Sequence, residues 1–140
     1  MEKLRVLFLC AGNSCRSQMA EAIVNARLGE AWEAVSAGVR PAAAVSQLAL
    51  RALREIGIEH AGRPKLPDEF LGVPLDLVVT LCDDAAANCP AWLGPGRKAH
   101  LGFPDPADAT GTEEERLRVY RAVRDDIARK VPVLLRSFES

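Results

Sequence analysis

The sequence predicts an α/β fold in which a four-stranded parallel sheet is flanked by helices on both faces, within a single domain covering residues 1–140. Two observations lead to this fold class. Short apolar runs typical of buried strands alternate with longer segments of helical periodicity, and such alternation favours parallel strands joined by helical crossovers. The length of 140 residues, with 49% hydrophobic and 26% charged residues, suits one globular domain with a full core.

Each expected element has its own local signal. Strands are predicted at residues 4–10, 32–39, 75–82 and 98–101. Helices are predicted at residues 17–28, 45–56 and 112–138. Gly57 closes the second helix, and Thr112 with Glu115 forms a capping box that opens the third. Pro132 lies inside this third helix and is expected to kink or interrupt it.

The loop between the first strand and the first helix is the strongest functional signal. It runs from Cys10 through Ala11, Gly12, Asn13, Ser14, Cys15, Arg16 and Ser17. A loop in this position turns backbone N–H groups inward to form an anion-binding nest, and Gly12 and Asn13 tolerate the positive φ that a nest needs. Arg16 adds a planar fork of donors that matches a tetrahedral oxyanion. We therefore predict an oxyanion-binding loop with Cys10 as a thiolate nucleophile; the alternative is an inert cysteine in a buried turn.

Two side chains elsewhere in the chain are expected to join this loop. Cys82 ends the third predicted strand as Cys10 ends the first, and the carboxyl ends of parallel strands meet at one edge of a sheet. Asp105 stands between two prolines on the loop after the last strand, where a fixed carboxyl group can act as a general acid. The alternative for Asp105 is a simple turn residue. Cys15 is interpreted as a packing residue, and His60 as a surface or half-buried side chain outside any motif.

The pair Cys82 and Cys89 raises the question of a disulfide. The segment between them, residues 83–88, is rich in alanine and predicted to be helical. Seven helical residues span about 10.5 Å, whereas a disulfide needs Cα atoms within about 7 Å. If these cysteines bond, the segment must unwind; the alternative is two unrelated buried thiols. The cysteine spacings fit zinc sites poorly, so no metal site is expected.

Charge and hydropathy exclude several classes of protein. The net charge is −1 and the basic residues form no stripe, so binding to nucleic acid is not expected. The apolar runs are too short to span a membrane. A strand begins almost at once after Met1, which leaves no room for a signal peptide. We expect a cytoplasmic monomer that needs no cofactor.

At this point the chain resembles a known superfamily. The oxyanion loop, its position near the amino terminus and the pair Asp105-Pro106 resemble the low-molecular-weight protein tyrosine phosphatases. The run of residues 13–21 and the pair Cys82 and Cys89 resemble the thioredoxin-coupled arsenate reductases built on the same fold. The phosphatases usually carry tyrosine or tryptophan after the Asp-Pro pair, where this chain has Ala107. The resemblance therefore favours the reductase branch.

The resemblance implies a reaction as well as a fold. Arsenate, a phosphate mimic, would bind the loop and Arg16, and Cys10 would attack the arsenic while Asp105 protonates the departing hydroxide. Cys82 would then attack the sulfur of Cys10, arsenite would leave, and Cys89 would pass the disulfide outward as Cys82–Cys89. Thioredoxin would reduce that disulfide.

The resemblance also implies a monovalent cation site in some relatives, through residues corresponding to Asn13, Glu21 and Ser36. The further acidic partner of such sites would fall near Lys65, so this chain departs from the pattern there.

Two alternative functions stay open. One is a phosphatase acting on small or protein phosphoesters with only Cys10, Arg16 and Asp105. The other is a thiol-based redox sensor that uses the cysteines and the anion nest for signalling. Dependence on Cys82 separates the reductase from the phosphatase, and turnover of an oxyanion separates the reductase from the sensor.

Overall fold

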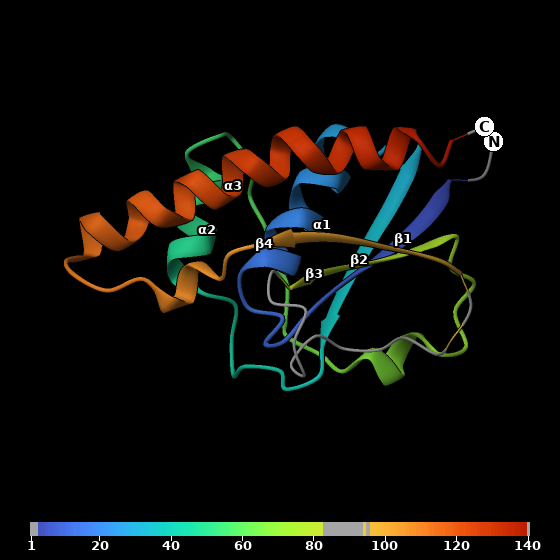
Figure 1. The fold of residues 1–140 in the computed structure, drawn as a ribbon, viewed down its shortest axis with the longest axis horizontal. Helices are drawn as coiled ribbons and strands as arrows, with labels where there is room; N and C mark the ends of the chain where they lie inside the picture. The colour runs from blue at the N-terminus through green and yellow to red at the C-terminus, as the bar shows by residue number, and fades with distance from the viewer. Residues whose placement is uncertain (1–2, 83–93, 95, 140) are drawn as a thin grey trace.

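The computed structural model describes residues 3–82, 94 and 96–139 (Figure 1). Within this part of the chain the strands are β1 (Leu4–Cys10), β2 (Trp32–Gly38), β3 (Leu77–Cys82) and β4 (Arg97–Phe103). The helices are α1 (Arg16–Arg27), α2 (Gln47–Arg54) and α3 (Glu113–Arg136), with short 3₁₀ helices η1 (Pro67–Phe70) and η2 (Pro106–Asp108). The predicted α/β fold with a four-stranded parallel sheet is confirmed.

The strand order places β1 inside the sheet, between β2 and β3. The order is β2-β1-β3-β4, and all three pairings are parallel. From β1 the chain moves first to β2 on one side and later returns to β3 on the other side. The carboxyl end of β1 is therefore the switch point of the sheet, where parallel α/β folds bind their ligands. Cys10 is the last residue of β1, and it pairs with Gly38 at the end of β2.

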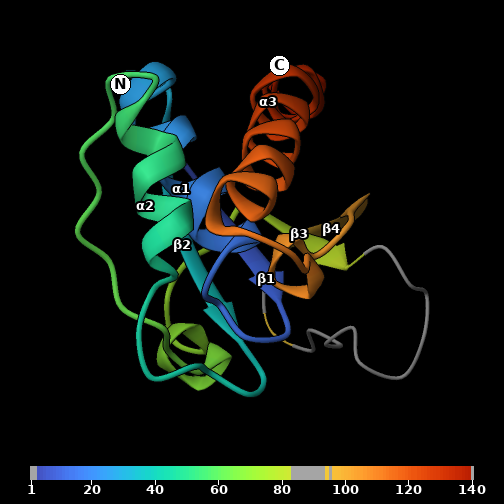
Figure 2. The same ribbon diagram turned by 90° about the vertical axis from the view of Figure 1, so that its left-hand side faces the viewer.

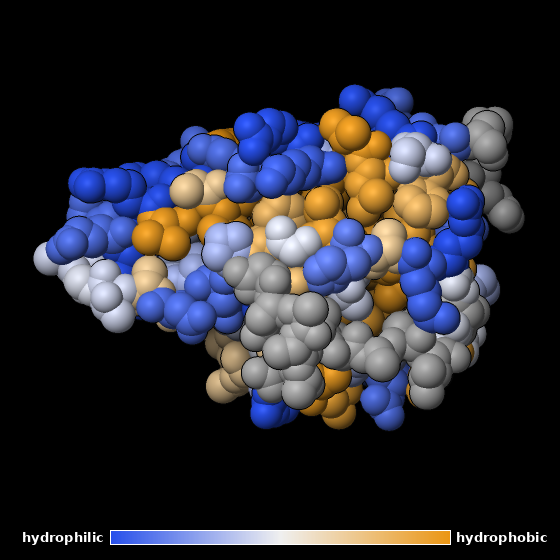
Figure 3. All heavy atoms as spheres, viewed as in Figure 1, coloured by the Kyte–Doolittle hydropathy of each residue, from blue (hydrophilic) through white to orange (hydrophobic). Residues whose placement is uncertain are grey.

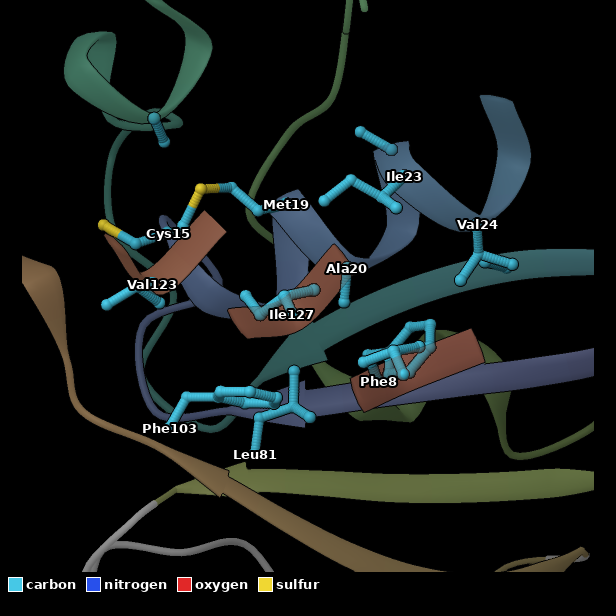
Figure 4. Packing of buried hydrophobic residues seen from close by; sticks show 14 of the residues in the cluster. Phe8, Cys15, Met19, Ala20, Ile23, Val24, Leu81, Phe103, Val123 and Ile127 are labelled. Carbon is cyan, nitrogen blue, oxygen red and sulfur yellow. The ribbon is translucent and has the colours of Figure 1, made fainter. Parts of the chain in front are cut away.

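The helices cover the two faces of the sheet unequally. All three α-helices lie on one face, with α1 between α2 and α3, and η1 lies on the other (Figure 2). Figure 4 shows Phe8, Leu81 and Phe103 from three strands meeting Met19 of α1 and Ile127 of α3. A smaller apolar cluster backs the opposite face. Helical elements thus cover both faces, as expected, and among the described residues the second face carries only the short 3₁₀ helix η1.

Most element boundaries match the sequence signals, and two features differ. The capping box at Thr112 is present: Thr112 Oγ1 accepts from the Glu115 N–H, and the Glu115 carboxylate accepts from the Thr112 N–H. β4 is longer than predicted and begins at Arg97. Helix α3 runs without interruption through Pro132, contrary to the alternative that it would break there. Val131 and Leu135 are fully buried on either side of the proline, so core packing holds the helix together despite the lost N–H.

The face formed by α3 and β4 carries exposed apolar side chains. Figure 3 shows them between charged residues of the same elements. Leu101 of β4 and Val133 and Leu134 of α3 line a shallow hollow there, and Val133 is 66% exposed. Among the helices of the described residues, none is both long enough and apolar enough to cross a bilayer.

An ion-pair cluster joins α2 to α3. The Glu55 carboxylate accepts from Arg121 at 2.7 and 2.8 Å and from Arg124 at 3.2 Å. The hydrogen bonds from Arg121 lower the pKa of Glu55 from 4.5 to about 2. A carboxyl group whose pKa is lower in the folded than in the unfolded state stabilises the fold at neutral pH, because the arginines interact with its charged form only in the folded protein.

The Glu55 cluster predicts a stability loss that depends on pH. Glu55→Gln should lower the free energy of unfolding at pH 7 by about 0.5–1 kcal/mol, the scale of a partly exposed ion pair. The contribution is complete above the ordinary pKa of 4.5 and fades as pH falls toward 2, so the two proteins should converge there. Urea unfolding across this range measures it, with Glu59→Gln at an exposed position as control. An equal deficit at both ends of the range would contradict the ion-pair explanation.

Candidate active site

The oxyanion loop connects β1 directly to the N-terminus of α1. Asn13 has a φ of 51° and is the one non-glycine residue with positive φ in the described part of the chain. A positive φ was also expected for Gly12, but Gly12 does not adopt one. Cys15 stands at the N-cap of α1 and makes no side-chain cap bond, so the first N–H groups of the helix lack a capping side chain. A helix N-terminus in this state attracts an anion.

The carbonyl groups of the loop are tied to its outer side. Ala11 O accepts from the Arg40 N–H at 2.9 Å, and Gly12 O accepts from the Ala42 N–H at 2.9 Å. Ser14 O accepts from the N–H of Ser46 at 3.0 Å. The segment between β2 and α2 therefore holds three loop carbonyls outward, which leaves the inner side to donors. This arrangement is the one that an oxyanion requires.

A chain of hydrogen bonds with a defined direction ends on the sulfur of Cys10. The Lys65 backbone N–H can only donate, and it donates to Asn13 Oδ1 at 3.0 Å. The Asn13 amide is thereby oriented so that its Nδ2 donates to Ser17 Oγ at 2.8 Å. The Ser17 hydroxyl, accepting from Asn13, has its proton free for Cys10 Sγ, which lies 2.8 Å away. The hydrogen bond from Ser17 therefore fixes the position of the Cys10 sulfur at the floor of the loop.

A second layer of polar side chains supports Asn13. Gln18 Nε2 donates to Asn13 O and Asn13 Oδ1, both at 3.2 Å, and to Arg63 O at 3.1 Å. These three acceptors fix the Gln18 amide, so its Oε1 faces His60 Nε2 at 2.7 Å. His60 Nε2 must therefore carry a proton. Burial lowers the pKa of His60, while the nearby Glu21 carboxylate acts in the opposite direction.

Arg16 is placed to bind a ligand that the protein itself does not supply. Its side chain is almost fully buried, with one terminal nitrogen donating to Phe103 O at 3.1 Å and the other 3.5 Å from Asp105 Oδ2. Its Nε is buried and has no hydrogen-bond partner among the described residues. A buried guanidinium N–H without a partner is costly, and an oxyanion in the loop is the acceptor it lacks. Asp105 is held in place because its Oδ1 accepts from the Ala107 N–H at 3.0 Å.

Cys15 lies in the core beside two hydroxyl groups. Its sulfur is 3.5 Å from the Tyr120 hydroxyl, which accepts from Ser46 Oγ at 3.1 Å. Burial raises the pKa of the Cys15 thiol, and it also raises the pKa of Tyr120 to about 12. Both groups stay neutral near pH 7, so Cys15 does not compete with Cys10 as nucleophile. The structure places Cys15 in the apolar core, in line with its interpretation as a packing residue.

The second thiol lies at the same edge of the sheet as the oxyanion loop. Cys82 ends β3, which pairs with β1 so that Leu9 lies opposite Thr80. Cys82 is buried, as are Cys10 and Cys15. Cys89 and residues 83–88 lie outside the described residues, so the expected helix and the Cys82–Cys89 pairing stay predictions.

Several contacts of the site could not be predicted from the local sequence. The Lys65 backbone reaches Asn13, and His60 reaches Gln18, from distant parts of the chain. Gly38 matters because β2 passes close to the loop: a Cβ on it would lie 2.6 Å from Ala11 O and 2.8 Å from the Asn13 nitrogen. None of these contacts follows from local sequence. Only the pairing of two strand ends in space brings them together.

Comparison with known proteins identifies the class. The family described as low molecular weight phosphotyrosine protein phosphatase matches residues 5–140. An arsenate reductase of Halalkalibacterium halodurans is 46% identical over 132 residues, which cover 94% of each chain. A solved structure of an arsenate reductase in its phosphate-binding state has a TM-score of 0.79 at 27% identity, covering 97% of this chain and 99% of that one.

A thioredoxin-dependent arsenate reductase from Corynebacterium glutamicum is also similar, with a TM-score of 0.69 at 27% identity over 97% of this chain and 62% of that one. The fold and the oxyanion loop thus define a member of the phosphatase-like α/β proteins. The chain belongs to the low molecular weight phosphotyrosine protein phosphatase family, as its loop indicated, and within that family it is similar to arsenate reductases.

The close approach of Gly38 to the loop predicts that alanine at this position weakens anion binding. Its Cβ would overlap backbone atoms of three loop residues, and overpacking of this kind costs about 1–3 kcal/mol. We expect Gly38→Ala to weaken sulfate binding by about tenfold or more, as measured by titration calorimetry. Gly72→Ala is the matched control, because a Cβ there meets no atom within 4 Å. Equal sulfate affinity in both variants would show that the loop does not depend on this contact.

Proposed function

We propose that this protein reduces arsenate to arsenite with the thiols of Cys10, Cys82 and Cys89. The observation that carries the proposal is a second buried cysteine, Cys82, at the end of the strand beside the one that ends in Cys10. Hydrolysis of a phosphoester needs one thiol, whereas reduction of an oxyanion needs a second thiol to form a disulfide. The similarity to arsenate reductases over nearly the whole chain supports the same conclusion.

The first step joins arsenic to sulfur. Arsenate occupies the loop, where the N-terminus of α1 and Arg16, including its unpartnered Nε, neutralise its charge. The Cys10 thiolate, supported by Ser17, attacks As(V), and an S–As bond replaces an As–O bond. Asp105, beside Arg16, gives its proton to the departing hydroxide, which leaves as water.

The second step transfers electrons. Cys82 attacks the sulfur of Cys10, and the electron pair of the S–As bond passes to arsenic. As(V) becomes As(III), arsenite leaves, and the two sulfurs are oxidised to a Cys10–Cys82 disulfide. Cys89 then attacks Cys82, which returns Cys10 to the thiolate and leaves a Cys82–Cys89 disulfide.

A dithiol protein must reduce the disulfide that remains. We propose thioredoxin for this role, supported by the similarity to the thioredoxin-dependent arsenate reductase from Corynebacterium glutamicum. Each turnover then consumes one dithiol, and the two electrons end on arsenic.

A second candidate function is hydrolysis of phosphoesters by Cys10, Arg16 and Asp105 alone. The contact between Arg16 and Asp105 favours it, because the same acid can protonate an alcohol as it leaves. Ala107, exposed beside that acid, offers no aromatic ring to hold a phosphotyrosine. Hydrolysis of small aryl phosphates is therefore the form of this activity that the site suits.

Replacing Cys82 should separate the two activities. Cys82→Ser should lower steady-state arsenate reduction by about a thousandfold or more, because no second thiol takes the sulfur of Cys10. The measurement is arsenate-dependent oxidation of NADPH with thioredoxin and thioredoxin reductase. Hydrolysis of an aryl phosphate by the same variant should stay within about threefold of the parent protein, since it needs no relay.

Cys10→Ser is the companion variant and should abolish both activities. If Cys82→Ser loses both to the same degree, Cys82 is a structural residue and the phosphatase becomes the preferred function. If the parent protein turns over neither arsenate nor an aryl phosphate, the redox sensor remains.

A further inference from the structure

A buried tyrosine connects the last helix to the oxyanion loop. Tyr120, on α3, is 2% exposed, and its hydroxyl lies 3.5 Å from the sulfur of Cys15. Cys15 is also buried and is the loop residue directly before α1. The proposed reaction uses neither side chain. Packing in the core requires only the aromatic ring of Tyr120, so the contacts of its hydroxyl point to a further role.

The Tyr120 hydroxyl belongs to a second directed chain of hydrogen bonds. The Ala49 N–H, which can only donate, donates to Ser46 Oγ at 3.4 Å in the N-cap of α2. The Ser46 hydroxyl donates in turn to Tyr120 Oη at 3.1 Å. Because a buried hydroxyl proton without an acceptor is costly, the Tyr120 proton is directed to the Cys15 sulfur. Burial raises the pKa of Tyr120 to about 12, so this proton stays in place at neutral pH.

Ser46 also holds the loop through its backbone. Its N–H donates to Ser14 O at 3.0 Å. Two consecutive loop residues are therefore tied to α2 and α3, Ser14 by its carbonyl and Cys15 by its sulfur. The next residue is Arg16, the first residue of α1. Fixing the two residues before it fixes the direction of the N–H groups that end the loop and begin the helix.

The two sulfurs of the loop are thus reached by similar routes. The chain that reaches Cys10 begins at the backbone N–H of Lys65, and the chain that reaches Cys15 begins at the backbone N–H of Ala49. Each chain passes through two side chains before it meets sulfur. The first anchors the start of the loop and the second anchors its end. A set of anion-binding donors is most effective when it is fixed before the ligand arrives.

We propose that Tyr120 is a positioning residue for the oxyanion loop, and that its hydrogen bonds with Ser46 and Cys15 hold the end of the loop in the shape that binds a tetrahedral anion. Cys15 acts in this arrangement as a hydrogen-bond acceptor as well as a packing residue. The inference rests on the proposed oxyanion site of residues 10–17 and does not depend on the thiol relay.

Removing only the Tyr120 hydroxyl tests this role. Tyr120→Phe should weaken sulfate binding by about three- to tenfold, the scale of one lost hydrogen bond, as measured by titration calorimetry. Thr112→Ala is the control, because it lowers stability by removing the N-cap of α3 at an exposed position. Its sulfate affinity should stay within about twofold of the parent value even where its thermal midpoint falls as far as that of Tyr120→Phe.

Variants of Cys15 test the contact itself. Cys15→Ala removes the acceptor and should weaken sulfate binding about as much as Tyr120→Phe. The double variant should bind sulfate no more weakly than the weaker single variant, because both changes break the same contact. Cys15→Ser keeps an acceptor for the Tyr120 hydroxyl and should bind sulfate within about twofold of the parent protein.

Several results would overturn the proposal. Sulfate affinity could be unchanged in Tyr120→Phe, or it could fall equally in Thr112→Ala, which would reduce the effect to general stability. Losses that multiply in the double variant, or a Cys15→Ser variant no better than Cys15→Ala, would show that the hydroxyl and the sulfur act separately. If the parent protein binds no sulfate, the oxyanion site itself is wrong and the proposal falls with it, whereas normal binding by the parent and by Tyr120→Phe rejects the role of Tyr120 alone.

Discussion

The side-chain amide of Asn13 is the constraint on which the rest of the site depends. The Asn13 backbone adopts a positive φ, which costs free energy in a residue other than glycine, and the whole residue is buried. The backbone N–H of Lys65 fixes which way the amide points, and the amide in turn directs the Ser17 hydroxyl at the sulfur of Cys10. A backbone donor 52 residues away in the sequence thereby determines that the Cys10 sulfur receives a hydrogen bond.

The sheet makes this orientation possible by placing strand ends side by side. Cys10 and Gly38 close neighbouring strands, and only a glycine lets β2 pass so near the loop backbone. The chain that leaves β2 then ties three loop carbonyls outward, and the segment before η1 returns to hold Asn13. On the other side of β1, β3 ends in Cys82. A switch point in strand order therefore brings together an anion site and a second thiol that lie far apart in the sequence.

The sequence was informative where the signal is local and weak where it depends on contacts between distant segments. The apolar runs, the capping box at Thr112 and the strand–loop–helix pattern around Cys10 led to the observed fold and loop, because each reflects physics within a few residues. Periodicity could not say that all three α-helices share one face, since that depends on crossover paths. Nor could it show that Gln18 would orient His60, because a lone histidine gives no hint of its partner. Pro132 was misleading for the same reason: the buried neighbours that keep α3 intact come from the tertiary core.

The charges around the loop divide into two groups with separate tasks. Arg16 and the uncapped N-terminus of α1 lie at the proposed oxyanion site, where the Arg16 Nε has no acceptor among the described residues. Behind the loop, the Glu21 carboxylate accepts from Ser36 Oγ and lies 3.8 Å from His60 Nε2. Cys15 and Tyr120 stay uncharged because burial raises both pKa values. The buried guanidinium of Arg16 is thus the positive charge closest to the loop, and its contacts with Phe103 O and Asp105 tie the loop to the end of β4. In the proposed reaction an oxyanion and the sulfur of Cys10 meet beside this charge, which would lower the repulsion between them.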